Sequence, residues 1–330
     1  MLRLPWFEHR SPRSVAEAAK ILAGEGPRAM LIAGGTDLLP NMKRRHQAPQ
    51  VLVSLRQVEE LRKLNGGFGA ALTLAEIVRS EKTPTALRQA AAQVATPHLR
   101  NMGTLGGNLC LDTRCTYYNQ TYEWRKAIDF CLKVDGKTCW VATASKRCVA
   151  VSSTDTAPAL IALDAAVTLV SASGSREVKV EDLYKNDGID YLSRRPDEIL
   201  TEVRVPAGWK STYWKLRRRG SFDFPILGVA AALKFDKDLI TEARIALGAV
   251  ASRPFLVEKA GEFLKGKKLS DETIAQAAGL VANRAKPMDN TDMDLYWRKE
   301  VADDFAGYAL RELRGDDLRA ERLKISRMMV

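Results

Sequence analysis

The sequence predicts an α+β fold, and three observations carry this prediction. Helix-initiation signals and short apolar strands alternate along roughly the first 60 residues. Between residues 212 and 250 the pattern indicates strands that follow one another, as in a small antiparallel sheet. Residues 253–330 then show consecutive helical patterns. A sheet followed along the chain by the helices that cover it is typical of α+β proteins.

The predicted N-terminal elements begin with two capping boxes. Ser14 and Glu17 form the first, with the serine as N-cap, and the helix that follows is expected to stop at Gly24. Thr73 and Glu76 form the second and open another helix. The remaining elements follow from short apolar runs: strands are expected over residues 30–33 and 51–55, and a helix over residues 84–94.

The character of the chain changes after Pro206, so we predict a domain boundary there. The predicted domains are residues 1–208 and 209–330; the first has subdomains at about 1–60 and 61–208 and a cysteine-rich insert at about 109–150. Further strands and helices are predicted from apolar periodicity. The strands are 166–171, 202–205, 229–235 and 243–249, and the helices are 254–264, 271–284 and 295 to about 314.

Composition excludes several classes of protein. Of the 330 residues, 46% are hydrophobic and 28% are charged, which is typical of a globular chain rather than a disordered one. No apolar run approaches the roughly 18 residues that a membrane span needs. The N-terminal segment has no apolar core of a secretory signal. We therefore expect a cytoplasmic protein with no membrane contact.

The net charge of +11, from 51 Lys and Arg against 40 Asp and Glu, is spread along the chain. A basic surface can attract nucleic acid, anionic membranes or acidic proteins. However, there is no run of five like charges, and no zinc-finger, RNP or homeodomain pattern. Solvated basic faces are therefore the favoured interpretation, and no nucleic-acid partner is expected.

Five cysteines lie within 39 residues, and the rest of the chain has none. An odd number in a cytoplasmic protein argues against a disulfide framework and favours a metal or redox site, with buried thiols as the alternative. Four thiolates are the ligands of a [4Fe–4S] cluster. A four-cysteine zinc site needs the same number, usually in Cys-x2-Cys pairs, and no such pair occurs here. These cysteines are Cys110, Cys115, Cys131, Cys139 and Cys148.

Two glycine turns are the other chemical signal. Gly34 to Asp37 follows an apolar strand, and Thr104 to Asn108 offers the same combination of paired glycines and polar side chains. Consecutive glycines let backbone N–H groups approach an anion closely. Each turn alone is most simply an ordinary turn. Together, two such turns could hold a pyrophosphate from both sides.

Four segments in fixed order resemble a known family: residues 31–37, 100–108, 155–160 and 213–225. They are similar to the FAD-binding medium subunit of the molybdenum hydroxylases, the superfamily of xanthine dehydrogenase and carbon monoxide dehydrogenase. The resemblance covers essentially the whole chain. It implies a flavoprotein subunit of an oxidoreductase. Its implied partners are a large molybdenum-cofactor subunit and a small [2Fe–2S] subunit, in a dimer of heterotrimers.

The same resemblance implies the FAD contacts. Asp155 would lie near the phosphate and ribose, and Leu200 and Lys215 match further flavin-contacting positions. Lys215 would place positive charge near the reduced flavin, favouring its anionic form; the alternative is a surface lysine beside a basic run. The pyrophosphate would be held by Leu31, Ile32, Ala33, Gly34, Gly35, Thr36, Asp37, Thr104, Leu105, Gly106, Gly107 and Asn108.

The insert sets this chain apart from ordinary members of the family, in which a much shorter segment joins the two motifs that here are separated by 46 residues. An insert with this cysteine spacing resembles the beta subunits of 4-hydroxybenzoyl-CoA reductases. This implies a [4Fe–4S] cluster, with Cys110 as a packing residue rather than a ligand. The implied ligands are Cys115, Cys131, Cys139 and Cys148.

The resemblance also implies a direction of electron flow. Electrons would pass from ferredoxin to [4Fe–4S] and FAD, then to the [2Fe–2S] clusters and molybdenum. There 4-hydroxybenzoyl-CoA would be reductively dehydroxylated to benzoyl-CoA, in anaerobic aromatic degradation. No catalytic residue is expected in this chain. Ferredoxins are typically acidic, so a basic rim could steer docking, with a solvated insert as the alternative. That rim would comprise Arg125, Lys126, Lys133, Lys137, Lys146 and Arg147.

Two alternatives remain open from the residues. One is the FAD subunit of another molybdenum hydroxylase, from which electrons leave to NAD or a quinone. The other is a basic nucleic-acid-binding protein with a four-cysteine zinc site. This second alternative leaves both glycine turns unexplained and lacks the expected cysteine pairs.

Overall fold

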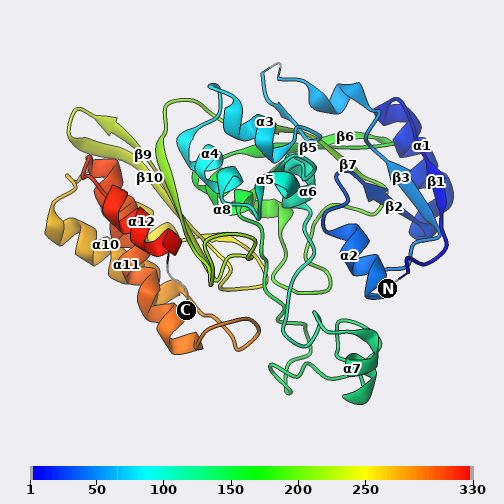
Figure 1. Ribbon diagram of the computed structural model, residues 1–330. Coiled ribbons are helices and arrows are strands. Elements are labelled where there is room, and N and C mark those ends of the chain that lie inside the picture. The colour runs from blue at the N-terminus through cyan, green and yellow to red at the C-terminus, as the bar shows by residue number, and fades with distance from the viewer. Residues whose placement is uncertain (1–2, 65, 328–330) are drawn as a thin grey trace.

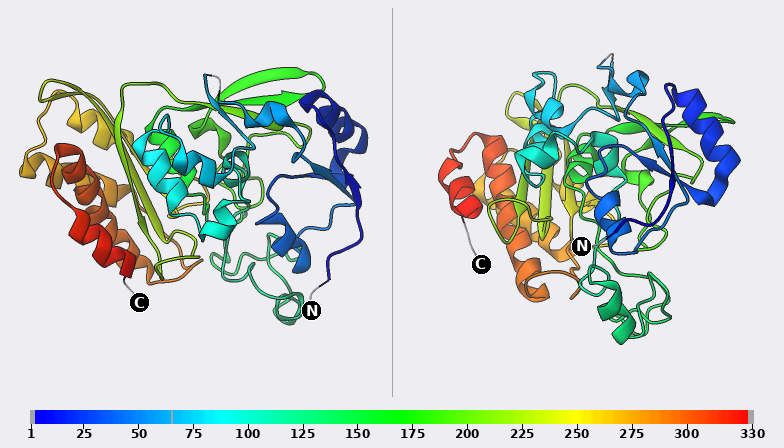
Figure 2. Two further views of the ribbon diagram at one scale, coloured as in Figure 1. Left: turned by 45° about the horizontal axis from the view of Figure 1, so that its top comes forward. Right: turned by 45° about the vertical axis from the view of Figure 1, so that its right-hand side comes forward.

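The computed structural model describes residues 3–64 and 66–327 and confirms the α+β class. Its three sheets lie side by side (Figure 1), and a small lobe with little regular structure extends below them. The N-terminal sheet and the sheet nearest the C-terminus flank the central one, which is seen again in the two turned views (Figure 2).

The N-terminal unit is a parallel three-stranded sheet of order β1-β3-β2. Helix α1 (Val15–Glu25) packs against it. Ser14 caps the helix as predicted, but the Glu17 carboxylate accepts the N–H of Arg13. The helix ends at Gly26, not at Gly24, because Gly26 adopts the positive φ of 55° that ends the helical path. The other elements are β1 (Glu8–Arg10), η1 (Gly26–Arg28), β2 (Ala29–Ile32), α2 (Leu38–Lys43) and β3 (Val51–Ser54).

The central unit is an antiparallel sheet of order β4-β7-β5-β6 with short helices packed around it. Its capping box at Thr73 and Glu76 is complete, as predicted. Strand β6 was not predicted, because its polar sequence lies at the exposed edge of the sheet. The elements are η2 (Glu59–Arg62), β4 (Phe68–Gly69), α3 (Leu74–Arg79), α4 (Thr85–Ala92), α5 (Pro97–Arg100), α6 (Leu105–Leu109), α8 (Thr156–Ala162), β5 (Ala166–Ser171), β6 (Gly174–Lys179), η3 (Glu181–Leu183) and β7 (Ile199–Arg204).

The C-terminal unit is an antiparallel sheet of order β11-β10-β9-β8 with helices on one face. Residues 255–256 form a strand rather than the start of a helix, because they pair with Ala246 and Leu247. No described helix is both long and apolar enough to cross a membrane. The elements are β8 (Lys210–Leu216), β9 (Leu227–Asp236), β10 (Leu239–Gly248), β11 (Phe255–Leu256), α9 (Glu258–Leu264), α10 (Asp271–Arg284), α11 (Leu295–Arg314) and α12 (Arg319–Arg327).

Strand β9 shows how the last two units join. Its residues alternate between two cores, because successive side chains of a strand point to opposite faces. Ala230 and Ala232 belong to the core shared with the central unit, whereas Val229 and Leu233 belong to the core beneath α10 and α11. The C-terminal sheet is therefore buried on both faces, and the two units share a hydrophobic interface.

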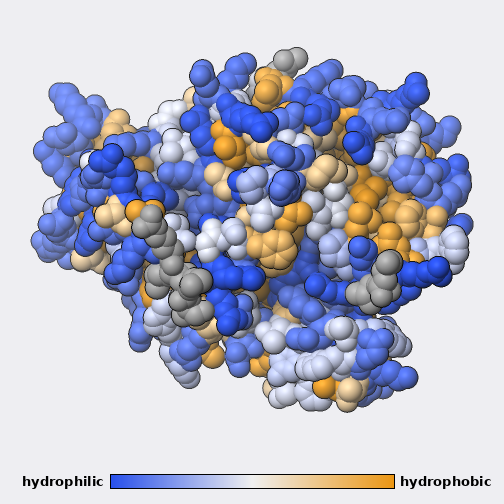
Figure 3. Space-filling model, in the orientation of Figure 1, coloured by the Kyte–Doolittle hydropathy of each residue, from blue (hydrophilic) through white to orange (hydrophobic). Residues whose placement is uncertain are grey.

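The insert forms the lobe at the bottom of the molecule. It contains one short helix, α7 (Tyr122–Ala127), and is otherwise turns. Its two ends meet where Arg114 and Val151 exchange backbone hydrogen bonds of 2.8 and 2.7 Å. In the space-filling view it stands apart from the body and has a mixed, mostly polar surface (Figure 3).

Candidate functional site

The first glycine turn joins β2 to α2 and lies against the loop that precedes the second turn. A Cβ atom on Gly34 would collide with the backbone carbonyl of Met102, and Gly35 adopts a φ of 69°. The Thr36 hydroxyl also lies near Gly103. Glycine at 34 therefore permits close approach of the two loops, and glycine at 35 permits the left-handed backbone.

Backbone donors are available at this first turn. Within the part of the chain that the structure describes, the N–H groups of Gly34, Gly35 and Thr36 have no protein acceptor. Consecutive unpaired N–H groups form an anion-binding concavity. This arrangement fits a phosphate group of FAD, although the predicted contacts of residues 31–37 stay a prediction.

The second turn is built into the fold more tightly. The N–H groups of Leu105 and Gly106 donate to the carbonyls of Leu72 and Ala70, at 2.9 and 2.8 Å. The N–H of Gly107 donates to the Thr104 hydroxyl at 3.1 Å, which caps α6. Because the N–H groups of Leu105, Gly106 and Gly107 already bind protein acceptors, a pyrophosphate contact by residues 104–108 stays a prediction.

Asn108 ties this turn to the start of α8. Its side-chain oxygen accepts the hydroxyls of Thr154 and Thr156 at 2.8 and 2.6 Å, and the N–H of Thr156 at 3.1 Å. Asn108 is buried, so these bonds satisfy an amide oxygen that water cannot reach. Asn108 therefore fixes Asp155, the residue between the two threonines, relative to the glycine turn.

Asp155 and Lys215 form a buried ion pair. The Asp155 carboxylate accepts Nζ of Lys215 at 2.9 Å and the Tyr213 hydroxyl at 2.8 Å. Lys215 also donates to the carbonyls of Gln93 and Asp223, both at 3.0 Å. Burial lowers the pKa of Lys215, and the charge of Asp155 opposes this shift. Lys215 is thus no surface lysine, while its predicted flavin contact stays a prediction.

Leu200 lies in the core of the central unit. It sits on β7 opposite Leu169 of β5 and is 5% exposed. Packing in this core is enough to explain an apolar residue at position 200. The predicted contact between Leu200 and the flavin therefore also stays a prediction.

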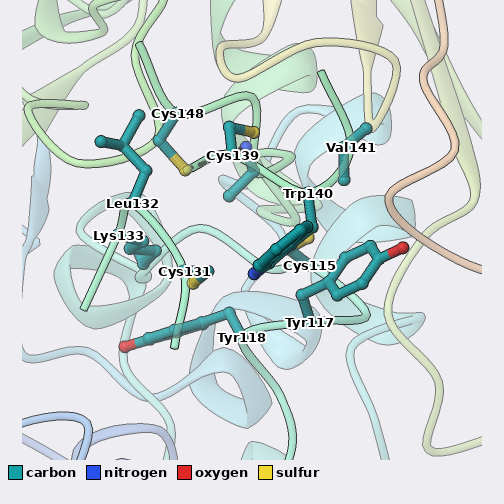
Figure 4. A pocket seen from close by; sticks show the side chains of 11 residues that line it. Cys115, Tyr117, Tyr118, Cys131, Leu132, Lys133, Cys139, Trp140, Val141 and Cys148 are labelled. Carbon is teal, nitrogen blue, oxygen red and sulfur yellow. Dashed lines mark hydrogen bonds between the residues drawn. The ribbon is translucent and has the colours of Figure 1, made fainter. Parts of the chain in front are cut away.

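Four of the five cysteines line a single pocket in the insert (Figure 4). The sulfur atoms of Cys115, Cys131, Cys139 and Cys148 face a common space, and each residue is only 5–7% exposed. Cys110 instead packs against the core of the central unit. The structure therefore brings together the four predicted ligands and separates them from Cys110.

Two of these sulfurs already receive backbone hydrogen bonds. The N–H groups of Tyr117 and Tyr118 donate to Cys115, and that of Ala150 donates to Cys148 at 3.4 Å. Burial nevertheless raises the pKa of Cys115 to about 11 and that of Cys148 to about 12. Thiolates here need a positively charged partner inside the pocket, which the iron of a cluster would supply.

The described cysteines are not arranged around one ion. Among residues 3–64 and 66–327, no group of three or more His, Cys, Asp or Glu stands where it could hold a single metal ion. In a [4Fe–4S] cluster each thiolate binds a different iron, so its ligands surround a larger space than those of a zinc ion. Four cysteine thiols that line one pocket are the donor set of a [4Fe–4S] cluster, so the residues present fit such a group, and the cluster itself stays a prediction.

The predicted basic rim is smaller than the sequence suggested. Arg125 is 1% exposed, and its guanidinium donates to the carbonyl of Arg44 at 3.0 Å. Nζ of Lys133 is bound to Asp112, Thr113 and the carbonyl of Gly188 at 2.8, 2.7 and 2.5 Å. The side chains of Arg125 and Lys133 are therefore bound within the protein and do not belong to the exposed rim. The exposed basic residues of the rim are Lys126, Lys137, Lys146 and Arg147.

Sequence reasoning missed two residues that hold the insert in place. Arg114 forms an ion pair with Asp37 of the first turn and donates to Asn41 of α2 at 2.9 Å. The side-chain amide of Asn290 donates to the carbonyl of Val149 at 2.6 Å, and the backbone carbonyl of Asn290 accepts the N–H of Thr116 at 2.9 Å. Their partners are distant in sequence. The position of Arg114 next to Cys115 was the signal in the sequence that could have pointed to a role for Arg114 in holding the insert.

Comparison with known proteins identifies the class. Residues 6–208 match the FAD binding domain in molybdopterin dehydrogenase, and residues 211–313 match the CO dehydrogenase flavoprotein C-terminal domain. The chain therefore belongs to the FAD-binding subunits of the molybdenum hydroxylases, which are oxidoreductases. This membership spans both domains and argues against a zinc-dependent nucleic-acid-binding protein.

Several relatives support this membership. The medium chain of glyceraldehyde dehydrogenase from Sulfolobus acidocaldarius is 28% identical, covering 94% of this chain and 99% of its own. The FAD-binding subunit of an aldehyde oxidoreductase from Escherichia coli is 30% identical, covering 77% and 84%. The medium chain of carbon monoxide dehydrogenase from Hydrogenophaga pseudoflava is 26% identical, covering 93% and 96%.

Solved structures show the same fold. Carbon monoxide dehydrogenase from Hydrogenophaga pseudoflava matches with a TM-score of 0.75 at 25% identity, over 94% of this chain and 97% of the other. Quinoline 2-oxidoreductase from Pseudomonas putida 86 matches with a TM-score of 0.75 at 26% identity, over 94% and 98%.

Proposed function

We propose that this chain is the flavin and [4Fe–4S] subunit of a molybdenum-containing 4-hydroxybenzoyl-CoA reductase, located in the cytoplasm. The observation that carries the proposal is the convergence of four buried cysteines on one pocket within the insert. The proposal therefore adds one electron-transfer group, the cluster, to the FAD that the family binds.

This chain's own contribution is to hold and separate two redox groups. The proposed FAD site is the turn from Gly34 to Thr36, beside the Met102 loop, whose backbone N–H groups have no acceptor among the described residues. The four ligands of the proposed cluster site are buried, which limits the contact of the site with solvent. A bound cluster carries single electrons, and a bound flavin exchanges electrons singly or in pairs, which suits delivery from a one-electron donor. No residue of this chain needs to touch the substrate.

The proposed partners follow from the relatives' names, which describe medium chains and FAD-binding subunits of larger enzymes. We propose a large molybdenum subunit and a small [2Fe–2S] subunit, in a dimer of heterotrimers. Ferredoxin is the proposed donor, from which electrons would pass through [4Fe–4S] and FAD to the [2Fe–2S] clusters and molybdenum. There two electrons and two protons would convert 4-hydroxybenzoyl-CoA to benzoyl-CoA and water.

The second candidate function is the FAD subunit of a hydroxylase that oxidises its substrate and releases electrons to NAD or a quinone. The relatives named as glyceraldehyde dehydrogenase and carbon monoxide dehydrogenase favour it. This candidate gives the four-cysteine pocket no role in accepting electrons from a low-potential donor.

The deciding experiment mixes the oxidised, assembled enzyme with reduced ferredoxin or NADH under anaerobic conditions and follows flavin absorbance. We expect bleaching with ferredoxin, and formation of benzoyl-CoA when 4-hydroxybenzoyl-CoA is added. Bleaching by NADH but not by ferredoxin, without benzoyl-CoA, would establish the second candidate instead.

A further inference from the structure

Arg114 connects the two proposed cofactor sites directly. Its guanidinium forms the ion pair with Asp37 at the end of the first glycine turn. It also donates to the side-chain oxygen of Asn41 at 2.9 Å, and Asn41 donates to Asp37 at 3.2 Å. The next residue along the chain is Cys115, whose sulfur lines the pocket. The side chains of Arg114, Asp37 and Asn41 thus each contact the other two, and they link the turn to the residue before the first cysteine of the pocket.

The surroundings bury this contact. Arg114 is 5% exposed, and its guanidinium carbon lies 5.0 Å from the ring centre of Phe224. A buried arginine that loses its carboxylate partner leaves an uncompensated charge. Its backbone is fixed as well, because Arg114 and Val151 close the base of the insert by two hydrogen bonds. Arg114 is therefore held at both ends, by Asp37 at its guanidinium and by Val151 at its backbone.

A second contact runs parallel to the first. The ring of His46, which follows α2, stacks on Tyr118 with 4.0 Å between ring centres. Tyr118 lines the cysteine pocket and donates its hydroxyl to Asp112 at 2.7 Å. The wall of the pocket therefore rests on the same segment, residues 37–46, that borders the first turn.

We infer that Arg114 is a positioning residue that couples the two sites, so that FAD and the cluster each strengthen binding of the other. This inference rests on the proposed function, because it requires both groups in this chain. FAD on the turn holds Asp37, and a cluster ligated by Cys115 holds Arg114, so each group orders one half of the same ion pair. Such coupling is reciprocal and typically amounts to about 5–150-fold in affinity.

The test measures FAD affinity on the full chain by quenching of flavin fluorescence, with the cluster intact and after its removal by chelation. For the wild type we expect FAD to bind at least about fivefold more tightly when the cluster is intact. Arg114→Met should bind FAD equally in both states, and Arg114→Lys should retain part of the difference because it keeps a charge opposite Asp37. The reciprocal measurement is the rate of cluster loss to the chelator, which added FAD should slow in the wild type only.

Two controls make the outcome decisive. Arg62→Met removes a half-exposed ion pair with Glu76 in the same domain and should leave the coupling intact. Asn41→Ala removes the two hydrogen bonds that Asn41 makes with Arg114 and Asp37 but keeps the ion pair between them, so it tests the coupling if Arg114→Met does not fold. Equal coupling in the wild type, Arg114→Met and Asn41→Ala would overturn the inference. A wild-type chain that contains no iron would overturn the proposed function instead.

Discussion

Nζ of Lys215 lies 2.9 Å from the carboxylate of Asp155, and both residues are at most 3% exposed. Asp155 precedes α8 of the central unit, whereas Lys215 belongs to β8 of the C-terminal sheet. The pair therefore crosses the interface between the two regions that match the family models, residues 6–208 and 211–313. Its carboxylate is held further by Tyr213, so the whole set behaves as one buried polar network.

Replacing Lys215 should destabilise the protein strongly. Lys215→Met leaves the Asp155 carboxylate buried without its counter-ion, and we expect a loss of about 3–5 kcal/mol in the free energy of unfolding. Urea unfolding followed by tryptophan fluorescence measures this loss. The double variant Lys215→Met with Asp155→Asn should recover part of it, because no buried charge remains. Lys210→Met, at an exposed position of the same strand, is the control. A loss as small as that of the control would contradict this account.

Gly34→Ala should weaken FAD binding by more than about tenfold, because a Cβ atom at this position would push the two loops apart. The dissociation constant for FAD, measured by flavin fluorescence, checks this. Gly24→Ala is the matched control. Gly24 lies within α1 with no atom within 4 Å of an added Cβ, so alanine there should add about 0.5–1 kcal/mol of stability and leave FAD binding unchanged. Unchanged affinity in Gly34→Ala would exclude this turn from the flavin site.

Acid should destabilise the contact between the insert and α2 through His46. Burial, aided by Arg125, lowers the pKa of this histidine from 6.5 to about 4. The unfolded state therefore binds more protons between these pH values. The resulting stability is fully present above pH 6.5 and is lost as the pH falls towards 4. After allowance for solvent screening, we expect a loss of about 1–3 kcal/mol.

The measurement for this prediction is urea unfolding at a series of pH values from 4 to 7. His46→Gln should flatten the dependence, while substitution of the exposed His98 should not. An unchanged pH profile in His46→Gln would assign the acid sensitivity to other groups.

The cysteines should divide into four ligands and one packing residue. Serine at any one of positions 115, 131, 139 or 148 should lower the iron content and the visible absorbance of the anaerobically purified chain, because each thiolate would hold one iron. Cys110→Ser should keep its iron, since Cys110 packs against the central core outside the pocket. Iron retained in all four single variants would remove these residues from the metal site.

Charge reversal at Lys146 and Arg147 should weaken docking of ferredoxin. Both side chains are exposed beside Cys148, and complementary charge mainly raises the association rate at low salt. We expect the rate of flavin reduction by ferredoxin to fall by about tenfold at low ionic strength and to depend less on salt. Lys268→Glu, an exposed change in the C-terminal domain, should have no effect. An unaltered salt dependence would leave these residues as solvated surface.

The elements with a strong local signal could be predicted from the sequence. The helix capped by Thr73, the helix that begins at Asp271 and the alternating strand at residues 166–171 depend on short-range signals, and the structure places them where the pattern indicated. Strand β6 and the ending of α1 at Gly26 could not be predicted, because an edge strand buries little and because Gly24 tolerates helical geometry.

The candidate site likewise has features that the sequence could predict and features that it could not. The resemblance of the insert to that of 4-hydroxybenzoyl-CoA reductases singled out four of the five cysteines, and the structure brings these four to one pocket. The burial of Lys133 and Arg125, and the pairing of Arg114 with Asp37, depend on partners tens of residues away. A single sequence carries no signal for such contacts, which form only when the insert folds onto the rest of the chain.

Quantification of iron, sulfide and FAD in one anaerobically purified sample of this chain tests the central claim most directly. The account predicts about four irons and about four sulfides for each chain and each FAD, with the absorbance of a [4Fe–4S] cluster beneath that of the flavin. One FAD with no iron would contradict it. The insert would then be a structural lobe with buried thiols, and the chain a flavin subunit without a route from ferredoxin.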